Sequence, residues 1–176
     1  MVERVKILKG GDELFFHPDV VSFYSSVIKE WRSEKEVALL LGCTKHKPYS
    51  SSFIHKKIIG MLNKHNLTSK VQEYIVGEPL VVVPREWETK YPAAHYDFPP
   101  SDMTESGRNV FVSRLNHFFR KAIEMHSIFI IFAPNHHREI ILDAINGLFC
   151  PITVPYNLYK LPVLLKTMKE VLNGKI

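Results

Sequence analysis

A chain of 176 residues is long enough for one domain and short for two. Its hydrophobic share of 45% and charged share of 23% are ordinary for a soluble globular protein, and its apolar runs are far shorter than a membrane span. Two cysteines exclude a disulfide scaffold, while a net charge of +5 and a pI near 9.1 favour an anionic partner, most commonly nucleic acid.

Charged residues interrupt the N-terminal sequence at positions 3, 4, 6 and 9. We therefore expect no signal peptide, no membrane contact and a cytoplasmic location. The sequence has no CxxC pair, P-loop or Rossmann glycine pattern, so we expect neither a cofactor nor a bound metal. The adjacent His136 and His137 leave this expectation unchanged, because neighbouring side chains rarely face one ion.

The first half of the chain predicts two helices and three extended segments. Pro18 marks the start of a helix over 19–31, where apolar residues recur at helical spacing. Residues 36–42 are predicted to form a fully buried strand, since 37–41 are all apolar, and residues 71–76 to form a second strand. A helix over 51–63 lies between them, with Ser51 and Ser52 as candidate caps. A short extended run over 79–83 ends at Pro84.

The second half continues the alternation of strands and helices. Three prolines predict an ordered loop over 86–101. Helices are predicted over 104–126, from a cap at Asn135 to about Gly147, and over 161–172, with buried strands over 128–133 and 150–154. This order predicts a single three-layer α/β/α domain over 1–176, with a four-stranded, mainly parallel sheet. Residues 1–35 contribute a packing helix.

Reactive side chains follow the first predicted strand directly. After Gly42 come a thiol, two lysines, a tyrosine, several hydroxyls and two histidines, between Cys43 and His55. In open α/β sheets, ligands bind at the carboxyl edge, where the strands end. This segment is therefore the first candidate site.

Two motifs resemble one family. Cys43 is followed at fixed spacing by Lys47-Pro48-Tyr49, Ser52 and His55, and a second stretch covers 83–88 and 91–97. Together they resemble the core domain of archaeosine synthase, the archaeal enzyme that acts on 7-cyano-7-deazaguanine already inserted into tRNA. The family usually has proline before the cysteine, where this chain has Gly42.

The resemblance implies a fold similar to uracil-DNA glycosylases. It also implies an activity that joins an amine, usually lysine, to the nitrile of the base and gives an amidine without ATP. Full-length members carry a transglycosylase-like domain and an RNA-binding PUA domain, and this chain has room for neither. We therefore expect a standalone domain that binds tRNA either by itself or with the help of a separate transglycosylase or PUA-domain protein.

The resemblance places three residues in catalysis, each with an alternative. Cys43 would add to the nitrile as a thiolate favoured by nearby cations, or would be a small buried residue at a strand end. Lys47 would bind phosphate or polarise the substrate, or would be a solvated lysine. His55 would be a general acid or base, or an exposed helical histidine.

The remaining candidates would bind substrate or RNA. Tyr49 would stack on a base, Ser52 is equally well explained as a helix cap, and Arg85 would hold an anion or pair with Glu86 or Asp97. Proton transfer or binding of the amine's ammonium group is expected of Glu86, His95 and Asp97. Anion or RNA binding is expected of Lys45, His136, His137 and Arg138. Cys150 is expected to be inert at the start of a buried strand.

These assignments make a spatial prediction. We expect one cleft to bring together Cys43, Lys47, His55, Arg85, His95 and residues 136–138. Two other functions stay open: a non-catalytic module that binds tRNA or the modified base beside a partner, and a glycosylase-like enzyme. The glycosylase ranks third because the motif after the first strand lacks an acidic residue to activate water.

Overall fold

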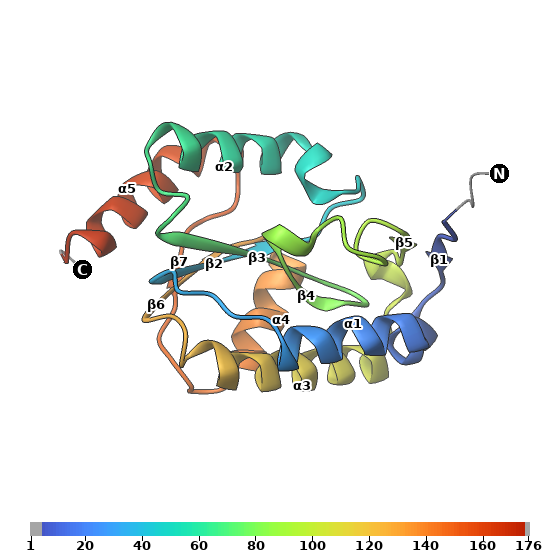
Figure 1. Cartoon of the computed structure of the whole chain (residues 1–176). Coiled ribbons are helices and arrows are strands. Elements are labelled where there is room, and N and C mark those ends of the chain that lie inside the picture. The colour runs from blue at the N-terminus through green and yellow to red at the C-terminus, as the bar shows by residue number, and fades with distance from the viewer. Residues whose placement is uncertain (1–4, 175–176) are drawn as a thin grey trace.

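The computed structural model describes residues 5–174 and is built around a five-stranded sheet in the order β4-β3-β2-β6-β7 (Figure 1). The strands are β2 (Val37–Gly42), β3 (Val71–Gly77), β4 (Val81–Pro84), β6 (Ile128–Phe132) and β7 (Ile152–Thr153). Neighbouring strands are parallel except for β4, which pairs antiparallel with β3. Every residue of β2 and β3 is buried, as expected for the centre of a sheet covered on both faces.

Helices cover both faces of this sheet (Figure 1). One layer holds α2 (Phe53–Lys64) and α5 (Leu161–Leu172), and the other holds α1 (Pro18–Lys29), α3 (Glu105–Ala122) and α4 (Asn135–Ile145). Two separate hydrophobic clusters, one on each side of the sheet, correspond to these layers. The predicted three-layer α/β/α fold is therefore confirmed. No helix among residues 5–174 is long and apolar enough to cross a membrane.

The sheet differs from the expectation in its strand count. The run after β3 was expected only to be extended, and it forms β4, because the three residues 78–80 between the strands allow a hairpin but no crossover. A separate two-stranded parallel pair joins β1 (Leu8–Lys9) to β5 (Tyr96–Asp97). Each strand of this pair has two residues, which is too short for a hydrophobic period to show in the sequence.

Two local expectations were wrong. The N-cap of α4 is Pro134 and not Asn135, because the extended backbone of Pro134 already precedes the first helical residue. Strand β7 is limited to Ile152 and Thr153, the residues that pair with β6. Cys150 lies before it and is exposed. The proposed cap at Ser52 is confirmed, since its hydroxyl accepts a hydrogen bond from the backbone N–H of His55.

Candidate active site

A cavity of about 350 Å³ opens at the carboxyl edge of the sheet, a size typical of small-molecule pockets. The loops after β2 and β3, the start of α4 and the segment at β5 form its wall. The lining residues are Cys43, Thr44, Lys45, Lys47, Glu78, Tyr96, Asp97, Phe98, Pro99, Pro100 and His137. One side of the cavity is therefore apolar and flat, and the other carries titratable groups.

Close approach of the backbone makes room for the Cys43 thiol. The N–H of Cys43 extends the ladder of β2 by donating to the Val76 carbonyl at 2.9 Å. A Cβ on Gly77 would lie 2.4 Å from Cys43 Sγ, so only glycine leaves space for the sulfur. A Cβ on Gly42 would similarly lie 2.8 Å from Pro134 Cδ and 3.0 Å from His137 Nδ1. The two glycines thus let Cys43 and His137 come together.

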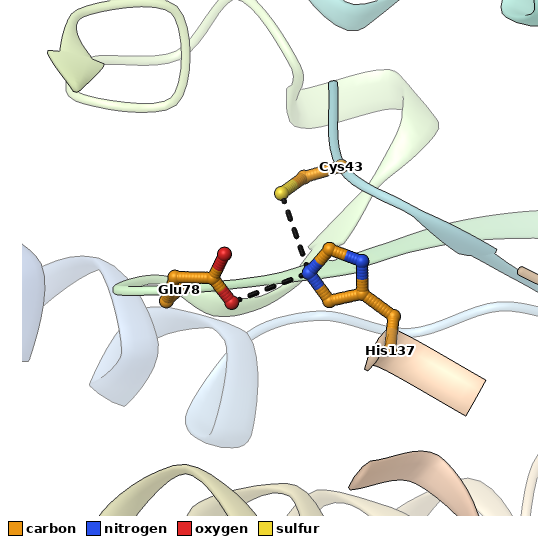
Figure 2. Close-up of side chains that lie close together, drawn as sticks. All are labelled: Cys43, Glu78 and His137. Atoms are coloured by element: carbon orange, nitrogen blue, oxygen red, sulfur yellow. Dashed lines mark hydrogen bonds and ion pairs between the residues drawn. The ribbon is translucent and has the colours of Figure 1, made fainter. Parts of the chain in front are cut away.

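Cys43, His137 and Glu78 form a cluster on the cavity wall (Figure 2). His137 Nε2 lies 3.6 Å from Cys43 Sγ and 3.2 Å from Glu78 Oε2. Glu78 is fully buried, and its Oε2 also lies 3.3 Å from His136 Nε2. One imidazole nitrogen of His137 therefore faces both the thiol and the carboxylate.

Burial and the local charges act in opposite directions on this cluster. Burial alone would raise the pKa of Glu78, but hydrogen bonds from His136 and His137 lower that pKa to about 2. Burial would lower the pKa of His137, whereas Cys43 and Glu78 raise it to about 10. At neutral pH the cluster therefore holds a carboxylate at Glu78 and an imidazolium at His137 whose Nε2–H faces the sulfur.

The donor types of the cluster also match those that bind zinc. The three ligand atoms of Cys43, Glu78 and His137 lie within 4.8 Å of one another. A metal-bound imidazole normally donates its other N–H to an acceptor, but Nδ1 of His137 is buried without a hydrogen-bond partner among the described residues. When His137 is protonated, its Nδ1–H is likewise without a hydrogen-bond acceptor. Leaving this group unpaired costs about 1–3 kcal/mol, and the contacts of Nε2 with Cys43 and Glu78 must offset that cost.

Lys47 orders the loop that carries Cys43. Its ammonium donates to the carbonyl of Thr44 at 2.9 Å and to that of Lys45 at 3.4 Å, and it lies 4.4 Å above the centre of the Tyr96 ring. Burial lowers the pKa of Lys47, although Cys43, Asp97 and Glu78 act in the opposite direction. Lys47 is therefore a half-buried cation of the cavity wall and not a solvated surface lysine.

His55 and Arg85 lie behind the cavity in a buried network. His55 Nε2 donates to the Gly42 carbonyl at 3.1 Å, so Nδ1 is the acceptor for Arg85 at 2.7 Å. Arg85 also pairs at 2.7 Å with each of Glu73 and Glu88. Burial and the Arg85 charge lower the pKa of His55 to about 4, which leaves it neutral. His55 is buried, not an exposed helical residue, and it supports the backbone next to Cys43.

The tyrosine that lines the cavity is Tyr96 and not Tyr49. Tyr49 is 1% exposed, and its hydroxyl lies 2.6 Å from that of Tyr96. Burial raises the pKa of both phenols well above the ordinary value, so both stay protonated. Tyr49 therefore supports the Tyr96 ring from below instead of offering its own ring to a base.

The other expected site residues divide between the cavity and the outside. Lys45 and Asp97 line the cavity, whereas His95 and Arg138 do not. Glu86 accepts hydrogen bonds from Gln72 and pairs with Lys35, beside the amino end of β3. The expected pairs of Arg85 with Glu86 or Asp97 are absent from the described residues, because Glu73 and Glu88 take those places.

Glu78 is the functional candidate that the sequence reasoning missed. It follows Gly77 at the end of β3, so an acidic residue directly after a buried strand was the available signal. Its presence removes the argument that no acid is at hand for a glycosylase-like reaction. The carboxylate is nevertheless fully buried and engaged by two imidazoles, which is unsuited to activating a water molecule.

Comparisons with known proteins identify relatives of this chain. Residues 20–158 match the family described as a domain of unknown function, DUF5591. The chain is 33% identical over 104 residues to archaeosine synthase subunit alpha of Thermoplasma acidophilum, covering 58% of this chain and 20% of that protein. It is 40% identical over 93 residues to the Methanosarcina acetivorans protein of the same name, covering 52% of this chain and 15% of that one.

A solved structure supports the fold. The crystal structure of AF0587, a protein of unknown function, superposes with a TM-score of 0.63 at 18% identity, over 85% of this chain and 48% of that one. The chain spans a fifth or less of the length of the two archaeosine synthase subunits it matches. The family match over 20–158 and these relatives together show that the chain belongs to the archaeosine synthase core-domain family, DUF5591.

Proposed function

We propose that this protein modifies archaeal tRNA during archaeosine synthesis by adding an amine, lysine first among the candidates, to the nitrile of 7-cyano-7-deazaguanine. The observation that carries the proposal is the Cys43 thiol on the cavity wall, 3.6 Å from His137 Nε2. The proposal of archaeosine synthesis is supported by the names of the relatives. The chemistry is supported by the thiol and the adjacent imidazolium, which offer a nucleophile for the nitrile carbon and a proton for the nitrile nitrogen.

The cavity suits a flat base. The exposed Pro99 and Pro100 line one side and offer apolar surface to the base, beside the largely buried rings of Tyr96 and Phe98. Asp97 is exposed at the same wall and forms no ion pair among residues 5–174. A carboxylate matches the N–H and amino donors on the Watson–Crick edge of a guanine-type base. We therefore assign base recognition to Asp97.

The first step forms a covalent intermediate on Cys43. The thiolate adds to the nitrile carbon, a C–S bond forms, and one π bond of the nitrile breaks. The nitrile nitrogen takes the Nε2 proton of His137, which gives a thioimidate and a neutral imidazole. Glu78 keeps His137 charged beforehand, and Lys47 adds positive charge at the wall.

The second step releases the product. The amine attacks the thioimidate carbon, and its proton passes to His137 Nε2. The C–S bond then breaks, the thiolate of Cys43 leaves, and an amidine remains on the base. The sum of the two steps is the addition of an amine to a nitrile, which needs neither an oxidant nor ATP.

Nucleoside mass spectrometry tests this proposal. The protein is incubated with tRNA carrying the cyano base and isotopically labelled lysine, with Cys43→Ala as the inactive control. The expected product is a nucleoside heavier by one complete lysine. Unchanged nucleoside in the presence of bound tRNA would instead favour a binding module, and loss of the base would favour a glycosylase. A further experiment adds a partner subunit, since the relatives are named as subunits.

A further inference from the structure

The net charge of the chain is distributed very unevenly. The 36 residues from Val37 to Gln72 contain six lysines and no acidic residue. Residues 1–36 and 73–149 together contain 13 basic and 17 acidic residues, so most of the structure is slightly acidic. The excess of positive charge therefore lies in the loop after β2, in α2 and in the residues that follow.

This charge lies on one layer of the fold. Helices α2 and α5 cover the same face of the sheet, opposite α1, α3 and α4 (Figure 1). On α5, the one acidic residue, Glu170, is paired with Lys166.

An open groove runs along this layer. Phe53, Lys56, Lys57, Gly60 and Lys64 of α2 line it, together with Leu161 at the start of α5. None of its three lysines forms an ion pair among the described residues. Phe53 is 61% exposed, and the Lys57 ammonium lies 5.2 Å from the centre of its ring. Lysines beside an exposed aromatic ring suit a nucleic-acid strand.

The groove and the candidate active site are formed by neighbouring segments of the chain. Residues 43–52 connect the cavity wall to Phe53, the first residue of α2. Lys45 and Lys47 line the cavity and add two lysines to the three that line the groove. A strand lying along α2 is thus continuous with a base inserted into the cavity, as enzymes that act on a base require.

We propose that the α2–α5 groove is the surface that binds the phosphate backbone of RNA, which on the proposed function is tRNA. The lysines contact phosphates and position the strand without reading its sequence. Phe53 stacks on an unpaired base next to the modified one. The α1–α3–α4 layer, on the opposite face of the sheet, faces away from the RNA (Figure 1).

Gly60 offers a substitution that leaves the fold intact. A Cβ at Gly60 meets nothing within 4 Å, and glycine inside a helix is destabilising, so other residues are tolerated there. We expect Gly60→Glu to weaken tRNA binding about ten-fold and to reduce its salt dependence, while Gly60→Ala binds like the wild type. Fluorescence anisotropy with a labelled tRNA transcript at several salt concentrations measures both.

A second pair controls for net charge. Lys57→Glu in the groove and Lys29→Glu on α1 change the net charge equally, and both lysines are exposed. The first is expected to lose affinity and the second to keep it. Equal affinities of Gly60→Glu and Gly60→Ala would overturn the groove as the binding surface. Absence of tRNA binding by the wild type would also overturn it, and labelling of Cys43 by a small nitrile would then show whether the proposed chemistry survives.

Discussion

Two histidines near the carboxyl edge of the sheet have opposite properties. His137 faces the cavity beside Cys43 and Glu78, and its pKa is raised to about 10. His55 lies behind the cavity between Gly42 and Arg85, and its pKa is lowered to about 4. Both histidines are buried, so burial does not explain why their pKa values shift in opposite directions. The sign of the neighbouring charge explains it. The proposed proton transfer therefore falls to His137, while His55 supports the backbone at Gly42.

The largest effect is expected at Cys43. Cys43→Ala should abolish both turnover and the trapping of a nitrile analogue, since the covalent step loses its nucleophile. Cys150→Ala should leave both unchanged, because Cys150 is exposed and does not line the cavity. Intact-protein mass spectrometry measures the adduct. Full activity of Cys43→Ala would mean that the amine attacks the nitrile directly, and Lys47 would then become the main electrophilic group.

Removing the charge of Glu78 should have the next largest effect. Glu78→Gln should lower the pKa of His137 and reduce the rate about 10²-fold at neutral pH. The alkaline limb of the pH–rate profile should move to lower pH, because His137 then loses its proton sooner. Rates measured between pH 5 and pH 10 would reveal the shift. An unchanged pH–rate profile in Glu78→Gln would mean that Glu78 does not control the pKa of His137. It would contradict the proposed role of His137 as the general acid.

Breaking the network behind the cavity should affect stability. Arg85→Ala leaves the carboxylates of Glu73 and Glu88 buried without their partner, and should destabilise the fold by about 3–5 kcal/mol. Urea unfolding measures this loss. Lys29→Ala, at an exposed site on α1, is the control and should change stability by less than about 0.5 kcal/mol. A small loss in Arg85→Ala would mean that water replaces the guanidinium.

The two histidines should also leave opposite signatures in stability against pH. The folded pKa of His55 lies below 6.5, so its contribution is full above pH 6.5 and is lost as the pH falls towards 4. The folded pKa of His137 lies above 6.5, so its contribution is full below pH 6.5 and is lost as the pH rises towards 10. His55→Gln should flatten the acid limb of Tm against pH, and His137→Gln the alkaline limb. If both variants flattened the same limb of the Tm curve, the opposite pKa shifts of His55 and His137 would be contradicted.

The smallest effect is expected from chelators. If the Cys43–Glu78–His137 cluster works by proton transfer, then EDTA or phenanthroline should change neither trapping nor turnover. Added Co²⁺ gives the complementary measurement, because a cobalt–thiolate bond absorbs in the near ultraviolet. Loss of activity on chelation, restored by zinc, would turn the cluster into a metal site.

Much of the fold followed from hydrophobic pattern. The unbroken apolar runs at 37–42 and 128–132 identified central strands, and the helix over 161–172 was predicted with the bounds that the structure has. The β1–β5 pair was missed because each of its strands has two residues and is held by a distant partner. Local pattern does not contain that information.

The site was predictable in part for the same reason. Cys43, Lys45, Lys47, Asp97 and His137 line the cavity, and the rule that parallel strands end at one edge was enough to group most of them. Glu78 was missed because the turn to β4 was not recognised as the continuation of that edge. His55 and Arg85 lie near the edge but face inward, which depends on side-chain direction and burial that spacing does not show.

The six lysines of residues 37–72, set against the slight acidic excess of residues 1–36 and 73–149, make the molecule an electric dipole. In solution a polyanion therefore exerts a torque on the protein before any contact forms, and turns the α2–α5 side, with the adjoining cavity opening, towards itself. At physiological ionic strength this orienting field extends only about 8 Å from the surface. The benefit is in the rate of productive encounter: fewer collisions occur at surfaces remote from the cavity, and this advantage fades as salt is added.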